Sequence, residues 1–114
     1  MSTLKPEITI DDLYKCDIRV GSVTKAETIP KSNKMLKLEV YFGPELGTKV
    51  IVATIAKSFD VDAILGVKVM AILNLPPRDI MGITSQGMLI AGHMTDTMIA
   101  LASCNGVPDG GSIV

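Results

Sequence analysis

The chain has 114 residues, of which 47% are hydrophobic and 20% charged, a balance typical of one compact domain and too small for a multidomain enzyme. Eleven Lys and Arg residues against twelve Asp and Glu residues give a formal net charge of −1, so no overall positive field gathers polyanions and any nucleic-acid site must be local. Aromatic residues make up only 4%, which argues against rows of stacked bases.

The two cysteines, Cys16 and Cys104, belong to no Cys-x-x-Cys spacing, so neither a zinc knuckle nor a redox pair is indicated. Residues 1–10 lack the apolar run of a signal peptide, and nowhere do about 18 apolar residues follow one another as a membrane span requires. We therefore expect a cytoplasmic protein with reduced cysteines and no membrane association.

The first elements expected are a short helical turn and a long bent strand. Thr9 or Asp11 can cap a turn through Leu13 and Tyr14, too brief to hold without packing onto the body. The apolar positions of residues 18–28 change phase after Gly21, which predicts a bend or bulge at that glycine.

The next two strands differ in their pattern. Residues 36–42 alternate apolar and polar side chains, which points Lys37 to solvent. After a turn over residues 43–47, the segment 49–56 is nearly all apolar, as in a central strand covered on both faces.

The rest of the chain predicts one helix and further strands. Ser58 or Asp60 caps a short helix that ends at Gly66. The later elements expected are a strand over 67–73, a long surface loop over 74–86, a fifth strand over 87–93 and a weaker one over 98–102.

This order predicts an all-β protein. Five main strands with a short helix between strands 3 and 4 match a five-stranded Greek-key OB-fold barrel, the oligonucleotide- and oligosaccharide-binding architecture. We expect a single domain over residues 1–114, with a core over about 8–102 and a C-terminal extension over about 103–114.

Four motifs resemble one family. They are Asp17-Ile-Arg-Val-Gly21, Ser32-Asn-Lys-Met-Leu-Lys-Leu38, Leu65-Gly66, and Asn74-Leu-Pro-Pro-Arg78 running into Gly82-Ile-Thr-Ser-Gln-Gly-Met-Leu89. Over about residues 8–114 the chain is similar to the tRNA-binding domain family, which includes the C-terminal appendage of many methionyl-tRNA synthetases, a free-standing dimeric protein, a cytokine-like synthetase cofactor domain and a chaperone branch. The resemblance implies an OB-fold that is homodimeric when free-standing and grips structured tRNA without catalysis.

Four lysines lie in the second motif and in the segment just before it. Lys25, Lys31, Lys34 and Lys37 are accompanied by only one acid, Glu27. Taken alone, such a cluster is a solvated hairpin. The resemblance makes Lys34 and Lys37 RNA-binding candidates, because outward-facing amines beside a groove neutralise phosphates.

The long loop supplies further candidates. Pro76 and Pro77 would hold the Arg78 guanidinium outward to clasp a phosphate, with pairing to Asp79 as the alternative. The family pattern adds further RNA-facing candidates, each with a structural alternative in loop or core. These are Asn74, Ser85 and Met88. Lys49 and Lys57, both ranked below the other candidates, extend the basic strip.

Catalysis and metal binding are not indicated. His93 is the single histidine and has no ligand-spaced partner. Ser85 lacks the preceding glycine of a nucleophile elbow. We expect no catalytic residue, no metal and no cofactor.

The predicted function is a non-catalytic tRNA-binding domain that reads tRNA shape through phosphate and ribose contacts. The expected partners are tRNA, a second copy of the chain and a methionyl-tRNA synthetase. Residues 98–102 and the tail to Val114 are candidate dimer contacts.

The alternative function is a peptide-binding, chaperone-like module of the same fold. It would use an adaptable apolar patch around the long loop. Its members are Ile80, Met81, Ile83 and Met88.

Overall fold

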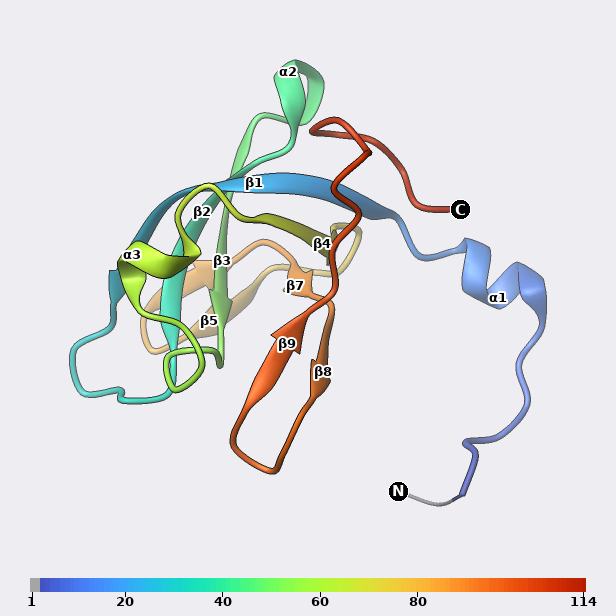
Figure 1. The fold of residues 1–114 in the computed structure, drawn as a ribbon. Coiled ribbons are helices and arrows are strands. Elements are labelled where there is room, and N and C mark those ends of the chain that lie inside the picture. Colours follow the sequence, from blue (N-terminus) through green and yellow to red (C-terminus); the bar gives the residue numbers. More distant parts are fainter. Residues whose placement is uncertain (1–2) are drawn as a thin grey trace.

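A curled, five-stranded antiparallel sheet forms the body of the protein (Figure 1). The computed structural model describes residues 3–114. The strand order is β3-β2-β1-β4-β7. These strands are β1 (Ile18–Thr28), β2 (Leu36–Tyr41), β3 (Thr48–Ala53), β4 (Lys68–Ile72) and β7 (Met88–Leu89). The predicted five-stranded OB-like barrel is confirmed, in the form of a half-barrel.

Short helices and two hairpins complete the fold. The helices are α1 (Ile10–Tyr14), α2 (Gly43–Leu46) and α3 (Val61–Ile64). The hairpins are β5 (Arg78–Ile80) with β6 (Ile83–Ser85), and β8 (Ala91–His93) with β9 (Ile99–Leu101). As predicted, α3 lies between the third and fourth strands of the sheet. Asp60 occupies its N-cap position without a side-chain hydrogen bond.

Strand β1 bends so that it pairs with two neighbours. Residues 18–22 pair with β4, and residues 22–28 pair with β2, with a bulge between Val23 and Lys25. At Gly21 an added Cβ would lie 2.7 Å from atoms of Phe42 and Val40. The predicted bend is confirmed, but Gly21 is required by the close approach of Phe42, and the bulge lies after Val23.

The core lies inside the curl of the sheet. Alternate residues of β2 and β4 point into it, and the most buried members have no exposed surface at all. Among them are Leu38, Val40, Ile51, Val69 and Ala71, each 0% exposed.

The open side of the half-barrel is closed by the end of β6 and the residue that follows it. The Ser85 hydroxyl accepts a hydrogen bond from the Val52 N–H at 3.0 Å. The Gln86 side-chain oxygen accepts one from the Val50 N–H at 2.8 Å, and the Gln86 N–H donates to the Val50 carbonyl at 2.7 Å. The side chains of Ser85 and Gln86 and the backbone N–H of Gln86 thus satisfy the polar backbone groups at the edge of β3, in place of a continuous strand ladder.

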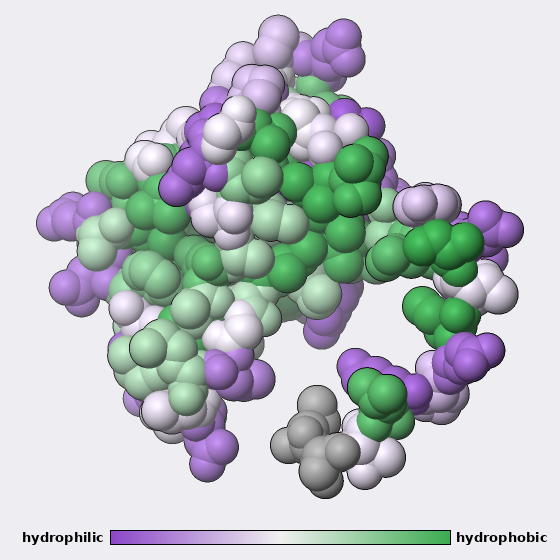
Figure 2. Space-filling view, turned by 45° about the vertical axis from the view of Figure 1, so that its right-hand side comes forward, coloured by the Kyte–Doolittle hydropathy of each residue, from purple (hydrophilic) through white to green (hydrophobic). Residues whose placement is uncertain are grey.

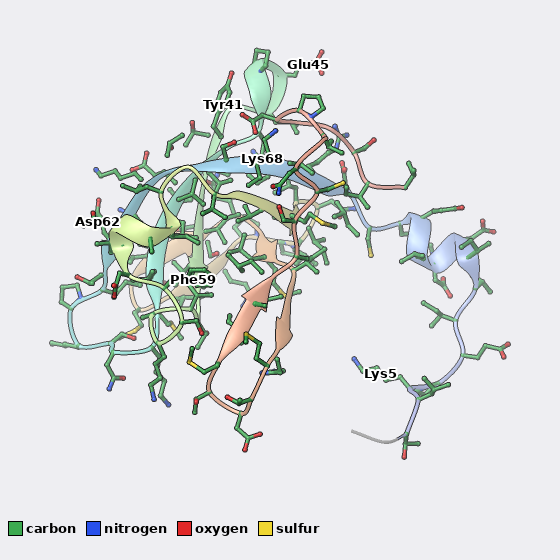
Figure 3. All side chains as sticks on the ribbon, viewed as in Figure 1. Lys5, Tyr41, Glu45, Phe59, Asp62 and Lys68 are labelled. Carbon is green, nitrogen blue, oxygen red and sulfur yellow. The ribbon has the colours of Figure 1, made fainter. Side chains whose placement is uncertain are left out.

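The C-terminal tail (residues 104–113) packs along β1. The Gly110 N–H donates to the Val20 carbonyl at 2.8 Å, and the Val20 N–H donates to the Gly111 carbonyl at 3.0 Å. Lys68, labelled in Figure 3, donates to a carbonyl of the tail, that of Val107, at 2.6 Å. The tail is therefore bonded to the barrel of its own chain.

Several of the predicted elements are wrong in detail. Strand β3, expected to be a central strand covered on both faces, is an end strand of the sheet. The segment 74–86, expected to be an irregular loop, contains the β5–β6 hairpin. Its two-residue turn, Met81-Gly82, has φ angles of 52° and 81°, and positive φ at both central residues suits the twist of a hairpin. The segment 43–47, expected to be a turn, forms the one-turn helix α2.

The expected fifth strand over 87–93 is divided. Ile90 separates β7 from β8 and donates its N–H to the Met70 carbonyl at 2.9 Å, while its own carbonyl accepts from the Ala102 N–H at 2.9 Å. The chain leaves the sheet at Ile90 and enters the β8–β9 hairpin, which projects from the barrel (Figure 1).

The N-terminal arm (residues 3–16) lies away from the barrel, and every one of its residues is exposed (Figures 1 and 3). The predicted cap of α1 is confirmed: the Thr9 hydroxyl accepts from the Asp12 N–H, and the Asp12 carboxylate accepts from the Thr9 N–H, both at 3.1 Å. The Thr9 N–H, followed by the Lys15 ammonium, lowers the pKa of Asp12. Helix α1 buries none of its own residues.

Across residues 3–114, no helix is both long enough and apolar enough to span a membrane.

Candidate nucleic-acid interface

A groove of about 610 Å³ opens beside β3. Its walls come from the end of β3, the loop before β2, strands β5 and β7, and the β8–β9 hairpin. In OB-folds the face of the second and third strands, with its flanking loops, binds oligonucleotides and oligosaccharides. The volume lies in the range of known ligand sites.

The floor of the groove is apolar and continues into the core. Ile55 is 2% exposed and belongs to the core cluster, and Ile99 packs against the same cluster. Met88, by contrast, is 50% exposed and presents its thioether to the groove. Met35 and Ile80 complete the apolar lining.

Cationic side chains from separate segments line the same groove. Lys34 precedes β2, Lys57 follows β3, and Arg78 begins β5. The Lys34 carbonyl accepts a hydrogen bond from the Ala56 N–H at 3.0 Å, which ties the segments of Lys34 and Lys57 together. Across residues 3–114, no carboxylate lies within ion-pair distance of any of these three cations.

Several cations outside the groove have carboxylate partners. Lys25 lies 3.1 Å from Glu27 and 3.8 Å from Glu39. The Lys25 hydrogen bond, the largest effect, lowers the pKa of Glu27, while Glu27 raises that of Lys25. Arg19 lies 2.6 Å from Asp17. The groove thus gathers three of the cations that have no ion-pair partner among residues 3–114.

Three of the predicted site residues meet there. Lys34, Arg78 and Met88 line the groove. Arg78 and Met88, with Ser85, also line a smaller adjoining hollow of about 60 Å³.

Two predicted lysines lie outside the groove lining. Lys37 is half-buried and stands opposite Val52, a groove residue, on one side and Glu27 on the other. Its positive charge helps to lower the pKa of Glu27, after the larger effects of Lys25. Lys49 lies near the start of β3, opposite Val40.

The side chains of Asn74 and Ser85 bond to the protein's own backbone. The Asn74 amide accepts from the Asp17 N–H at 2.8 Å and donates to the Lys15 carbonyl at 2.7 Å. Ser85 is 4% exposed, and its hydroxyl also donates to the Gly87 carbonyl at 3.2 Å. Neither side chain needs RNA to satisfy its polar atoms.

Sequence reasoning did not assign several groove residues to the site, and it undervalued Lys57. Of the missed residues, His93 and Asp96 belong to the β8–β9 hairpin, while Lys57 had been ranked below Lys34 and Lys37. His93 and Asp96 were missed because we interpreted the segment 87–93 as one strand of the barrel. In the structure this segment is divided, and its second part belongs to the β8–β9 hairpin, which brings both residues to the groove. Among the described residues, no three His, Cys, Asp or Glu side chains are grouped to hold a metal ion.

A curled five-stranded barrel whose groove is apolar within and cationic at its margin defines an OB-fold binding module. Residues 18–110 match the family model described as "Putative tRNA binding domain", and the chain belongs to this family. The family description names a binding domain, and the chain is accordingly non-catalytic.

Curated relatives of the chain are synthetases. It is 40% identical over 111 residues to the methionine–tRNA ligase of Chloroherpeton thalassium, covering 97% of the chain and 15% of that protein. It is 42% identical over 91 residues to the ligase of Thermotoga maritima, covering 80% of the chain and 14% of the ligase. The chain thus spans about one seventh of the length of these relatives.

Solved structures of similar chains have the same fold. A protein related to methionyl-tRNA synthetase from Pyrococcus horikoshii superimposes with a TM-score of 0.87 at 32% identity, covering 96% of this chain and 100% of that one. The chaperone CsaA from Bacillus anthracis gives a TM-score of 0.86 at 30% identity, with the same coverage.

Proposed function

We propose that the chain binds folded tRNA at the groove, through phosphate and ribose contacts that read shape. The observation that carries the proposal is the convergence of Lys34, Lys57 and Arg78 on one groove, without ion-pair partners among residues 3–114. Each cation that neutralises a phosphate releases condensed counterions. A protein of net charge −1 thereby gains a local site for a polyanion.

The neighbouring predicted residues extend this surface. Lys37 on β2 stands opposite the groove residue Val52, and Lys49 lies near the start of β3. In this proposal both would meet phosphates further along the RNA. In this proposal Asn74 and Ser85 hold the segment that carries Arg78 in place. Their remaining oxygen lone pairs would accept hydrogen bonds from ribose hydroxyls.

A salt series on tRNA binding tests the proposal. Each lost phosphate contact should flatten the plot of log affinity against log salt by about 0.7 to 0.9. At 0.1 M salt the same relation gives about five- to eightfold weaker binding per cation. We therefore expect Lys34→Ala with Arg78→Ala to weaken binding of all tRNAs by about 25- to 60-fold.

Lys25→Ala is the matched control, because Lys25 is exposed but paired with Glu27 and Glu39 outside the groove. It should leave both affinity and slope unchanged. Equal losses per positive charge removed in Lys25→Ala and in the groove variant would show that only overall charge matters and would contradict the proposal.

We also propose that the chain forms a homodimer through the N-terminal arm. Its apolar side chains are exposed and unpacked: Leu4, Ile8, Ile10, Leu13 and Tyr14 are 49–95% exposed. Figure 2 shows these apolar residues on the arm, across open space from a broad apolar surface of the body. The C-terminal tail, by contrast, is already bonded to β1. A dimer would place two groove sites on one RNA.

Analytical ultracentrifugation at low micromolar concentration tests the dimer. We expect twice the chain mass of 12.1 kDa, and the single-chain mass for Leu13→Asp with Tyr14→Asp. A single-chain mass for the unaltered protein would refute the dimer.

The partner that the relatives indicate is a methionyl-tRNA synthetase, whose tRNA the domain would help to hold. A role with tRNA places the chain in the cytoplasm in this proposal. Pull-down of the synthetase, or a lowered KM for tRNA when the domain is added, would support the partnership.

The second candidate function is peptide binding in the same groove. Its apolar floor, with Met35 and Met88, favours this, and a structural neighbour is a chaperone. Met81, which was predicted to belong to the peptide patch, lies at the tip of the β5–β6 hairpin, outside the groove lining. Met88→Asp should therefore abolish peptide capture where Met81→Asp does not.

A further inference from the structure

We propose that the groove takes up the base of one unpaired nucleotide of the bound RNA, while the cations at its margin hold that nucleotide's phosphates. The ligand class is a single-stranded nucleotide next to a structured RNA. This inference rests on the proposed function and deepens it.

The combination of floor and margin carries the inference. Contacts to phosphate alone require cations but no hollow of about 610 Å³ with an apolar floor. An apolar peptide requires the hollow but no group of unpaired cations. A nucleotide has one apolar, planar part and one anionic part, and it matches both features.

The groove also offers partners for the face of a base. The low content of Phe, Tyr and Trp argued against stacking. However, the imidazole of His93 and the guanidinium of Arg78 both line the groove, and both types of group stack on unpaired bases. The thioethers of Met35 and Met88 are polarizable and make favourable contacts with aromatic rings.

The walls of the groove are tied in place. The Ile99 N–H donates to the Ser58 hydroxyl at 2.9 Å, which fixes the β8–β9 hairpin to the segment after β3. The Lys34 carbonyl accepts from the Ala56 N–H at 3.0 Å and fixes the opposite side. A preformed site of this kind avoids an ordering cost on binding.

The uncharged hydroxyl groups and the one carboxylate of the lining are few. Among them are Asp96 and Thr97. Recognition by faces rather than edges is tolerant of base identity. We therefore expect an unpaired base to strengthen binding whichever base it is.

The test uses three RNAs built on one hairpin: blunt, with a two-nucleotide 3′ overhang, and with the same overhang lacking its bases. The last two carry equal phosphate charge, so the ratio of their affinities isolates the base. For the unaltered protein we expect the overhang with bases to bind about five- to tenfold more tightly than the abasic one.

Two methionine variants make a matched pair, because Met88 and Met81 are each 50% exposed but only Met88 lines the groove. We expect Met88→Ala to reduce the affinity ratio to about twofold or less, and Met81→Ala to leave it unchanged. Far-UV circular dichroism confirms that both variants are folded.

If the unaltered protein bound the base-containing and the abasic overhang equally, the inference would be overturned. If that protein still bound tRNA, the proposed function would stand, because it does not depend on the base. An equal fall of the ratio in both methionine variants would place the base elsewhere and also overturn the inference. If the unaltered protein bound neither the test RNAs nor tRNA at low salt, the proposed function itself would be contradicted.

Discussion

Gly110 is the position at which the joining of the C-terminal tail to the barrel can be tested. It has a φ of +87°, and an added Cβ would collide with the Phe42 carbonyl oxygen. Gly66 has a φ of +78° but open space around it, and Gly92 has open space and no positive φ. Alanine at these three glycines therefore separates backbone strain from collision.

The expected losses in the free energy of unfolding form a series. Gly92→Ala should have almost no effect. Gly66→Ala should lose about 1–2 kcal/mol, the cost of a left-handed conformation. Gly110→Ala should lose that and about 1–3 kcal/mol for overpacking, about 2–5 kcal/mol in total.

Urea denaturation followed by far-UV circular dichroism measures these differences, since the chain has no Trp to report by fluorescence. Comparable m-values are needed to compare the free energies. A loss for Gly110→Ala no larger than that for Gly66→Ala would refute the view that the tail is locked against Phe42.

Three further predictions concern side chains bonded within the fold. Ser85→Ala should lower the free energy of unfolding by about 1–3 kcal/mol, because the buried Val52 N–H loses its acceptor; weaker tRNA binding at unchanged stability in urea denaturation would contradict this. Asn74→Ala should speed hydrogen exchange at the Asp17 amide, which Asn74 now binds; unchanged exchange would argue against that anchor. Glu27 has a lowered pKa, so its contribution to stability is present above the ordinary carboxyl pKa and is lost as the pH falls through the lowered pKa. Lys25→Ala should raise the pKa of Glu27 towards its ordinary value in an NMR titration of the carboxyl carbon, and no change would contradict the pairing.

Local patterns were enough to predict most of the sheet. The alternation from Leu36 to Phe42 identified β2, because burial of every second residue is a property of the strand itself. Thr9 and Asp11 were both recognised as candidate caps of α1 for a similar reason, since a capping side chain acts within a few residues. The structure selects Thr9.

The β5–β6 hairpin could not be predicted in this way. Its turn places Met81 at a φ of 52°, where Asn or Asp is usual. The pairing of Arg78 with Ser85 and the bond from Val52 to Ser85 stabilise the hairpin from outside the turn. Tertiary contacts therefore decide this structure, and local residue preference does not.

The groove depended on long-range contacts as well. Lys34 and Arg78 are far apart in sequence and were linked only by the family resemblance, whereas His93 reached the groove through a hairpin that the sequence did not reveal. The packing requirement stated for α1 is also informative. The helix buries nothing against its own barrel, which is why we assign its apolar side chains to a second copy.

The most direct test of the account is a map of amide chemical shifts on titration with tRNA. We predict that the changes cluster at the groove, around Lys34, Lys57, Arg78, Met88 and His93. The mixed-charge face around Lys25 and Glu39 should stay unchanged. Changes confined to that face or to the C-terminal tail, with the groove residues unaffected, would contradict the assignment of the groove as the RNA site.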